Sequence, residues 1–290
     1  MKGLRAWGMA LALLALPAAA RAEMEKVGIP LRTGGEISGL FSLPQGQGPF
    51  PGIVALHGCG GLLTKKGKLH ARETDWAKRL NAAGYAVLFP DSFTARGYAS
   101  VCSLRDRPVL PERERVRDAY DALAWLQARA EVQPRRIALF GWSHGAMTAL
   151  WAMAKASPGR PAGLTDDFIG AVAFYPGCAQ VYRDEKDYGV IAPVLFQLGA
   201  ADEWTPAAPC VKLAEEAAAR PGPRIAVDVY AGSHHGFDNP TGAVHEVVVK
   251  NSVYKSGQKV VHVGRNPEAR ERAIARAMGW LGDLFAGAVR

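Results

Sequence analysis

The sequence has 290 residues, of which 49% are hydrophobic and 21% are charged, as in an ordinary globular protein. The formal net charge is +8 at pH 7, but basic and acidic residues are interspersed, as in Glu112-Arg113-Glu114-Arg115. This pattern is typical of a solvated helix surface and excludes a basic stripe for nucleic acid. After the N-terminus, no apolar run approaches the ~20 residues needed to span a bilayer, so stable membrane insertion is not expected.

The first 22 residues have the three parts of a secretory signal peptide. Lys2 and Arg5 form a positive region, Trp7–Leu16 form a short apolar core, and Ala20-Arg21-Ala22 is a small-x-small cleavage site. An N-terminal anchor or a buried helix is the alternative, but the apolar core is short for either. We expect cleavage after Ala22 and a periplasmic or secreted mature chain. Because the segment holds three of the 35 basic residues, the mature chain has 32 against 27 acidic ones, a charge of +5.

The mature chain alternates between apolar runs and helix-forming segments. The predicted strands are 36–43, 52–56, 85–89, 136–140, 168–175, 194–198 and 225–230. The predicted helices are 73–83, 112–129, 146–154, 206–219 and 267–286. Uniformly apolar strands separated by helices indicate a mostly parallel sheet with helices on both faces. The sequence therefore predicts an α/β fold, with residues 23–290 in a single domain.

Residues 241–264 are less regular than the rest. Two valine-rich runs, 247–249 and 260–263, are separated by the turn-forming residues Lys255-Ser256-Gly257. These features predict a small β-hairpin inserted between the last strand of the sheet and the closing helix.

The motif Gly141-Trp142-Ser143-His144-Gly145 reads G-x-S-x-G. It follows an apolar strand and leads directly into a helix, which is the context of a nucleophile elbow. Small residues must flank the nucleophile, because the chain turns tightly from strand to helix. A short turn rich in small residues is the alternative interpretation of these five letters alone. In this context the motif predicts that Ser143 is a nucleophile.

A serine nucleophile needs a base and an acid, which follow it along the chain in the order acid, then histidine. Asp202 follows the predicted strand 194–198, with Glu203 as the alternative acid. His234 and His235 follow the strand that ends at Tyr230. A helix-capping role for the aspartate and an exposed turn for the histidines are the alternatives. All these side chains are expected at the carboxyl edge of the sheet, where functional groups of open α/β sheets collect.

The tetrahedral intermediate of such an enzyme needs backbone donors. The loop His57-Gly58-Cys59-Gly60-Gly61 follows a predicted strand, and its glycines allow N–H groups to point inward. One of these N–H groups and that of His144 would form a two-donor oxyanion hole. A plain glycine-rich turn is the alternative.

The mature chain contains four cysteines, Cys59, Cys102, Cys178 and Cys210. An even number in an oxidising compartment predicts two disulfides, and the spacing allows three pairings. No C-x-x-C pair is present, so the sequence gives no support for a metal site.

Together these segments resemble the dienelactone hydrolase family of α/β-hydrolases, in its exported serine-type branch. The segments that carry the resemblance are 57–61, 89–93, 96–97, 141–145, 175–178, Gly199 with Asp202, and 235–238. The resemblance covers about residues 30 to 285. It implies an α/β-hydrolase fold, with Ser143 as nucleophile, Asp202 as acid, His235 as base, and the Cys59 N–H as oxyanion donor.

The sequence departs from the family pattern at two positions. Ser143 replaces the family's nucleophilic cysteine, which favours ordinary ester chemistry over dienelactone itself. Gly58 replaces the glutamate of cysteine-type members, which is consistent with a serine enzyme. Arg96 matches, with one residue inserted, an arginine that grips a substrate carboxylate in the family. Trp142, beside the nucleophile, is also assigned to substrate binding.

The sequence thus predicts an exported hydrolase of small carboxylic esters or lactones that needs no cofactor and no metal. A peptidase or acyltransferase on the same triad and a non-catalytic binding module are the alternatives. For the disulfides we favour Cys59–Cys102 and Cys178–Cys210, because each pair joins loops expected at the same edge of the sheet.

Overall fold

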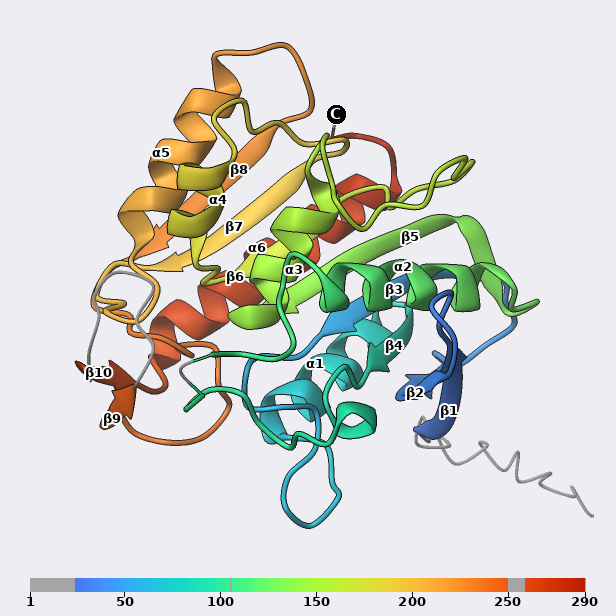
Figure 1. Ribbon diagram of the computed structural model, residues 1–290, viewed down its shortest axis with the longest axis horizontal. Helices are drawn as coiled ribbons and strands as arrows, with labels where there is room; N and C mark the ends of the chain where they lie inside the picture. The colour runs from blue at the N-terminus through green and yellow to red at the C-terminus, as the bar shows by residue number, and fades with distance from the viewer. Residues whose placement is uncertain (1–23, 105, 250–258, 290) are drawn as a thin grey trace, which may run out of the picture.

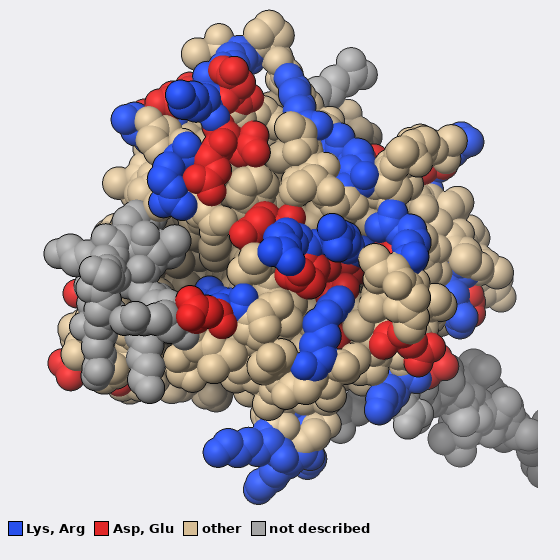
Figure 2. All heavy atoms as spheres, in the orientation of Figure 1, with Lys and Arg blue, Asp and Glu red and all other residues tan. Residues whose placement is uncertain are grey.

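The structure is a computed structural model that describes residues 24–104, 106–249 and 259–289. The proposed signal peptide, residues 1–22, lies outside the described residues. Among the described residues, no helix is long and apolar enough to cross a membrane. On the face shown in Figure 2, Lys and Arg side chains lie interspersed with Asp and Glu side chains, as the sequence indicates.

Eight strands of the described chain form one sheet in the order β1-β2-β4-β3-β5-β6-β7-β8. Their bounds are β1 Glu25–Pro30, β2 Glu36–Ser42, β3 Phe50–Leu56, β4 Ala86–Pro90, β5 Val132–Trp142, β6 Ala171–Phe174, β7 Val194–Gly199 and β8 Ile225–Tyr230. The pairs β1–β2 and β2–β4 are antiparallel, and every later pair is parallel. The expected mostly parallel sheet is confirmed.

Helices cover both faces of this sheet (Figure 1). The helices are α1 Ala71–Ala82, α2 Glu114–Gln127, α3 His144–Met153, α4 Cys178–Asp184, α5 Ala207–Ala218 and α6 Pro267–Phe285, with a 3-10 turn η1 at Thr94–Arg96. Apolar side chains of α2, α3, α4 and α5 pack in one core, and those of α1 and α6 pack in the other. The molecule is therefore a three-layer α/β fold.

The two cores explain why the strands are uniformly apolar. Successive residues of a strand point to opposite faces of the sheet. In β5, Ile137 and Leu139 join the core under α2 and α3, whereas Ala138 and Phe140 join the core under α6. Both faces exclude water, so no position of the strand's buried part can be polar without an internal partner.

The structure adds helix α4, the 3-10 turn η1 and two strand segments to the predicted elements. Strand β1 is new, and it forms the antiparallel edge of the sheet beside β2. Strand β5 begins at Val132, before the apolar run, and its first residues up to Arg136 are largely exposed. Neither segment has a uniformly apolar pattern, because each lies at the border of the sheet where one side meets water.

The expected hairpin is present as β9 His245–Val249 and β10 Lys259–Val263, which pair in antiparallel fashion. The turn expected at Lys255-Ser256-Gly257 lies outside the described residues. The hairpin joins the main body through a parallel bridge between His235 and Val263, and through the Gly264 N–H, which donates to the His235 carbonyl over 3.0 Å.

Both disulfides form in the favoured pairing. Cys178–Cys210 links the N-terminus of α4 to α5. Cys59–Cys102 links the loop after β3 to the segment after η1. Each therefore fixes loops at the carboxyl edge of the sheet.

Replacing both members of the buried pair, Cys178→Ala with Cys210→Ala, is expected to lower the free energy of unfolding by about 3 kcal/mol. The bond closes a segment of sequence separation 32, so its loss frees the unfolded chain. Urea denaturation of the oxidised variant and wild type measures the difference. Equal midpoints and slopes for the two proteins would contradict the prediction.

Candidate active site

Ser143 lies at the sharp turn between β5 and α3. Its backbone has φ 52° and ψ −114°, a conformation that L-residues rarely adopt. A Cβ atom added to Gly141 would lie 2.5 Å from the Gly145 carbonyl oxygen, and one added to Gly145 would lie 2.0 Å from the Leu56 carbonyl oxygen. Only glycine fits at these two positions, so the spacing in the motif is set by the close approach of β5, α3 and β3.

Ser143, His235 and Asp202 lie in line. The Ser143 Oγ atom is 2.9 Å from His235 Nε2, and His235 Nδ1 is 2.8 Å from Asp202 Oδ2. A carboxylate can only accept, so Nδ1–H donates to the aspartate and the Nε2 lone pair faces the serine hydroxyl. The structure thus brings together the nucleophile, base and acid that the sequence predicts, from three loops at one edge of the sheet.

Asp202 is held by its own loop. Its Oδ1 accepts the backbone N–H groups of Trp204 and Thr205 over 2.9 and 2.8 Å. The Thr205 hydroxyl lies 2.9 Å from Oδ2. The carboxylate side chain has no exposed surface, so these donors replace the water that it would otherwise bind. The acid therefore has one fixed orientation toward His235.

Two aromatic rings hold the His235 imidazole. The ring centroids of Tyr175 and Trp204 lie 4.6 and 4.9 Å from that of the imidazole. Rings packed at these distances leave little room for the imidazole to turn about its side-chain bonds. The sequence predicted no role for either residue, although Tyr175 lies in the segment 175–178 that carries the resemblance.

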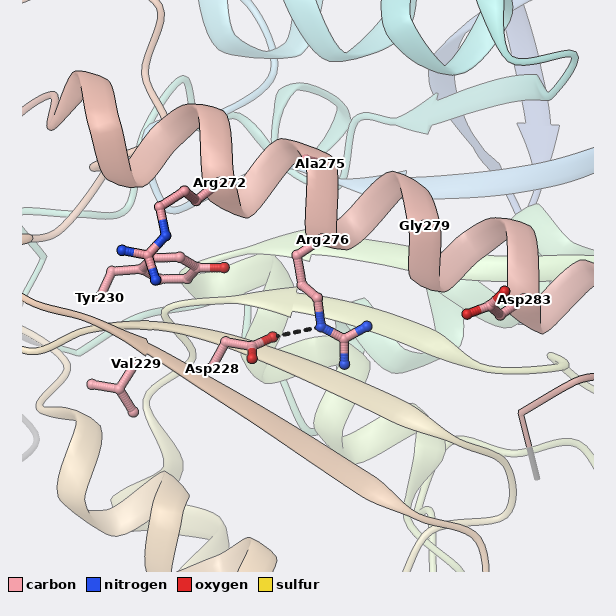
Figure 3. Close-up of a pocket in the computed structure, with 8 residues that line it drawn as sticks. All are labelled: Asp228, Val229, Tyr230, Arg272, Ala275, Arg276, Gly279 and Asp283. Carbon is pink, nitrogen blue, oxygen red and sulfur yellow. Dashed lines mark hydrogen bonds and ion pairs between the residues drawn. The ribbon is translucent and has the colours of Figure 1, made fainter.

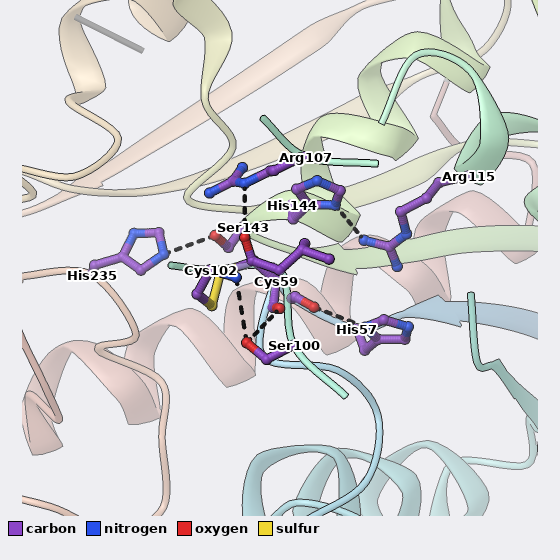
Figure 4. The surroundings of a disulfide bond; sticks show 11 residues. His57, Cys59, Ser100, Cys102, Arg107, Arg115, Ser143, His144 and His235 are labelled. Atoms are coloured by element: carbon purple, nitrogen blue, oxygen red, sulfur yellow. Dashed lines mark hydrogen bonds between the residues drawn. A yellow bond between two sulfur atoms is a disulfide. The ribbon is translucent and has the colours of Figure 1, made fainter. Parts of the chain in front are cut away.

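The loop after β3 is placed against the nucleophile (Figure 4). A Cβ atom added to Gly58 would lie 3.8 Å from Ser143 Cβ. The Cys59 carbonyl accepts the Val101 N–H over 2.9 Å, and the disulfide with Cys102 fastens the same residue. Among the described residues, no acceptor lies within hydrogen-bond range of the Cys59 N–H or the His144 N–H. Within the described part of the chain, both expected oxyanion donors thus lack a bond to a protein acceptor.

His57 orients the peptide that carries one of these donors. Its Nδ1–H donates to the Gly58 carbonyl over 2.8 Å, and its Nε2 accepts the Ser92 N–H over 3.3 Å. In a trans peptide the C=O and N–H groups point in opposite directions. Fixing the Gly58 carbonyl thus also fixes the Cys59 N–H. Burial and the nearby Arg115 lower the pKa of His57 well below its usual value, so the ring is neutral.

His144 is the first residue of α3, and its ring is buried beneath the elbow. Arg115 Nη1 donates to His144 Nδ1 over 2.9 Å, which places the imidazole proton on Nε2. Burial and Arg115 lower the pKa of His144 well below its usual value. Burial also lowers the pKa of Arg115 to about 9. The buried Arg115 guanidinium therefore contacts the side chain of the first residue of α3.

A cavity of about 370 Å³ opens onto the triad. Ser143 and His235 line it together with Cys59, Arg72 and Trp204. A second hollow of about 530 Å³ lies between β8 and α6 (Figure 3). That hollow contains none of the predicted catalytic residues. The smaller cavity is therefore the candidate substrate pocket.

Arg96 does not lie where a substrate carboxylate would bind. Its guanidinium forms two bonds with the buried Asp118, over 2.7 and 2.8 Å, and a third with the Ser92 carbonyl. It is absent from the lining of the pocket. The cation in the pocket lining is Arg72, which pairs with Glu73 and donates to Tyr175. The resemblance predicted that Arg96 binds a substrate carboxylate. In the structure Arg96 instead links η1 to α2 through Asp118.

Trp142 is also placed differently from the expectation. The ring is fully buried on the inner side of the elbow and does not line the pocket. Its indole N–H donates to Asp238 over 2.9 Å. Trp142 is the last residue of β5 and joins the core under α1 and α6, whereas Ser143 follows it in the turn before α3 and lines the pocket.

Asp238 is a further functional residue of the site. The carboxylate is fully buried and accepts the indole N–H groups of Trp76 and Trp142, each over 2.9 Å, and the Tyr175 hydroxyl over 2.5 Å. Burial raises the pKa of Tyr175 well above its usual value, so the hydroxyl keeps its proton and donates. The sequence signal for this residue was its place in the segment His235-Gly236-Phe237-Asp238.

A mostly parallel sheet covered on both faces, with a nucleophile elbow after a central strand, defines an α/β-hydrolase. The chain belongs to the dienelactone hydrolase family, because the family model matches residues 37–285. The family and the serine in the nucleophile position make the chain a carboxylic-ester hydrolase. A search of curated proteins finds no significant match.

Solved structures share the fold at low sequence identity. A candidate dienelactone hydrolase from Klebsiella pneumoniae is 18% identical with a TM-score of 0.65, over 90% of this chain and 99% of its own. A dienelactone hydrolase-like promiscuous phosphotriesterase from metagenomic libraries is 19% identical with a TM-score of 0.63, over 91% and 99%. Thermogutta terrifontis esterase 2, phosphorylated by paraoxon, is 18% identical with a TM-score of 0.64, over 92% and 95%.

Asp238→Ala is expected to lower the free energy of unfolding by about 4 kcal/mol or more. The change leaves three buried donors without an acceptor, and each costs about 1–3 kcal/mol. Urea denaturation measures the loss. Asp283→Ala, at an exposed position of α6, is the matched control and is expected to stay within about 0.5 kcal/mol of wild type. Similar values for the two variants would contradict the structural role of Asp238.

The lowered pKa values of His57 and His144 make stability depend on pH. Below about pH 6.5 the unfolded chain protonates both rings while the folded chain does not. The free energy of unfolding therefore decreases as the pH is lowered below that value. Each ring contributes about 1.4 kcal/mol per pH unit in that window. His57→Asn is expected to remove one such contribution from the slope measured by urea denaturation between pH 5 and 8. An unchanged slope would overturn the assignment.

Proposed function

We propose that the chain is an exported serine hydrolase that cleaves small carboxylic esters or lactones through a Ser143–His235–Asp202 triad and an acyl-enzyme. The observation that carries this proposal is the 2.9 Å distance between Ser143 Oγ and His235 Nε2, with Asp202 behind the imidazole at 2.8 Å. These are the distances and the order of groups that nucleophilic catalysis by serine requires.

In the first step the serine oxygen attacks the ester carbonyl carbon, and His235 Nε2 accepts the hydroxyl proton. The imidazole then carries a positive charge next to the Asp202 carboxylate. Since Asp202 is fully buried and already holds three donors, it needs no reorganisation to stabilise that charge. The acid thus acts on the imidazolium while remaining ionised itself.

The carbonyl oxygen becomes negatively charged as the tetrahedral intermediate forms. The backbone N–H groups of Cys59 and His144 are the proposed donors to it. His57 and the Cys59–Cys102 disulfide hold the first donor, and the start of α3 holds the second. One such donor typically contributes ~3–4 kcal/mol of transition-state stabilisation.

Collapse of the intermediate breaks the bond to the alcohol oxygen, and the His235 imidazolium gives its proton to that oxygen. The acyl group stays on Ser143 until water attacks the acyl carbon. His235 accepts the water proton, and the carboxylic acid leaves when Ser143 Oγ regains its proton. Every proton in this cycle moves between His235, Ser143 and the substrate or water.

The pocket supports a small substrate. Its volume of about 370 Å³ lies at the lower end of the range for small-molecule sites. Trp204 and the Cys59–Cys102 disulfide lie beside Ser143 in its lining. An ester or lactone of a small acid is the class that fits.

Export is the second part of the proposal. Residues 1–22 have the pattern of a cleaved signal peptide. The two disulfides support this, because such bonds persist in oxidising compartments such as the periplasm or the extracellular medium.

The mature protein is expected to hydrolyse short p-nitrophenyl esters, and Ser143→Ala and His235→Ala are each expected to lower kcat/KM at least about a thousandfold. His245→Ala, an exposed histidine of β9, is the matched control and keeps wild-type activity. Paraoxon is expected to phosphorylate the wild-type peptide that contains Ser143 and to leave Ser143→Ala unlabelled, as read by peptide mass mapping.

Wild-type protein that is inert toward esters and unlabelled by paraoxon would favour a binding module on a hydrolase scaffold. Labelling of Ser143 with turnover of peptides or transfer to an added alcohol, but no ester hydrolysis, would favour a peptidase or an acyltransferase.

A further inference from the structure

Three side chains that could bind a metal meet beside the triad without lining its pocket. Glu203 follows Asp202 on the loop after β7, His234 precedes His235 on the loop after β8, and His262 belongs to β10. One possible ligand atom from each residue lies within 4.8 Å of those of the other two. All three side chains are half-buried, so an ion from solvent can reach them.

His234 is oriented as metal-binding histidines usually are. Its Nδ1–H donates to the Ala201 carbonyl over 2.9 Å, which leaves the lone pair of Nε2 available. A hydrogen bond from the other ring nitrogen to a carbonyl is the usual way in which proteins fix the tautomer of a ligating imidazole. The His234 and His262 ring centroids are 5.3 Å apart.

His262 and Glu203 are already aligned with each other. Glu203 Oε2 accepts the backbone N–H of His262 over 2.9 Å and lies 2.8 Å from its Nδ1. A second carboxylate, from Glu246, lies 3.8 Å from His262 Nε2. Two carboxylates beside two imidazoles make this a place where a divalent cation gains charge compensation.

We propose that Glu203, His234 and His262 form a binding site for a divalent transition metal of the Zn²⁺ type. Two imidazoles and one carboxylate are a common set of protein ligands for zinc, with water in the fourth position. Tetrahedral bonds of about 2.0–2.1 Å require ligand atoms about 3.4 Å apart. The ligand atoms now lie within 4.8 Å of one another, and rotation of the three partly exposed side chains brings them to the shorter spacing.

Such a metal would fasten the hairpin to both catalytic loops. Asp202 and His235 are the chain neighbours of two of the ligands, and β10 carries the third. Among the described residues, the hairpin's attachments at this point include the bridge between His235 and Val263, the Gly264 bond to the His235 carbonyl and the contact of Glu203 with His262. A bound ion adds a link that exists only in the folded protein, so it stabilises the fold by mass action.

The test uses the mature protein after treatment with a chelator and dialysis. Calorimetric titration with Zn²⁺ is expected to give one equivalent bound, and Co²⁺ is expected to give the visible absorption of a four-coordinate site. Zn²⁺ at about a hundred times its Kd is expected to raise Tm by about 5 °C. None of these readouts depends on ester hydrolysis.

Three variants assign the ligands. His234→Ala and His262→Ala are each expected to weaken Zn²⁺ binding at least about tenfold and to cut the Tm rise at the same Zn²⁺ concentration to about half or less. Glu203→Gln, which keeps the shape of the side chain, is expected to do the same and guards against misfolding of the alanine variants. His245→Ala is the control, since its ring bonds to the Ala243 carbonyl outside the cluster.

Wild-type behaviour of the His245 variant with loss in the other three would support the site. No binding by wild type, or equal binding by wild type and the ligand variants, would overturn it. Either result would leave Glu203 and His262 as a hydrogen-bonded pair without a metal.

Discussion

The buried carboxylate of Asp238 is the interaction on which the geometry of this site depends. It lies on the loop of the catalytic histidine and receives hydrogen bonds from Trp76 of α1, Trp142 of the elbow and Tyr175 after β6. A buried charge is tolerated only when its lone pairs are satisfied, so these segments cannot separate without exposing it or leaving it unpaired. The elbow carries Ser143, the loop of Asp238 carries His235, and the Tyr175 ring packs against the His235 ring.

Neutral buried imidazoles make a second, independent contribution. His57 fixes the peptide before the Cys59 N–H, and His144 receives the buried Arg115 behind the elbow. In both cases burial keeps the ring uncharged, so it acts as a directional hydrogen-bonding group. Backbone donors that are held in place before a reaction stabilise developing charge without reorganisation. The proposed role of the Cys59 N–H in the loop after β3 depends on such fixation. The glycine at position 58 leaves space beside the nucleophile that a larger side chain would fill.

The sequence predicted the triad positions from the elbow and from chain order, and the structure brings these three side chains within hydrogen-bond range. Ser143, Asp202 and His235 each follow a strand at the carboxyl edge of a parallel sheet, so chain order brings them together. The resemblance placed Arg96 at a substrate carboxylate, but its guanidinium pairs with the buried Asp118 and does not line the pocket. The supporting residues around the triad, such as Thr205 and Trp204, come from loops whose conformation no periodicity encodes.

The sequence by itself determined the layered α/β architecture, the elbow, the hairpin and the chain order of the triad. These features follow from apolar runs, glycine spacing and turn residues. Such patterns depend only on residues that are close together in the sequence, so they can be recognised without the tertiary structure. Only the tertiary structure decided that Trp142 points into the core, that His57 holds the Gly58 carbonyl, and that Glu203, His234 and His262 meet. Those outcomes depend on contacts between segments far apart in sequence, where packing and the need to satisfy buried polar groups select one arrangement.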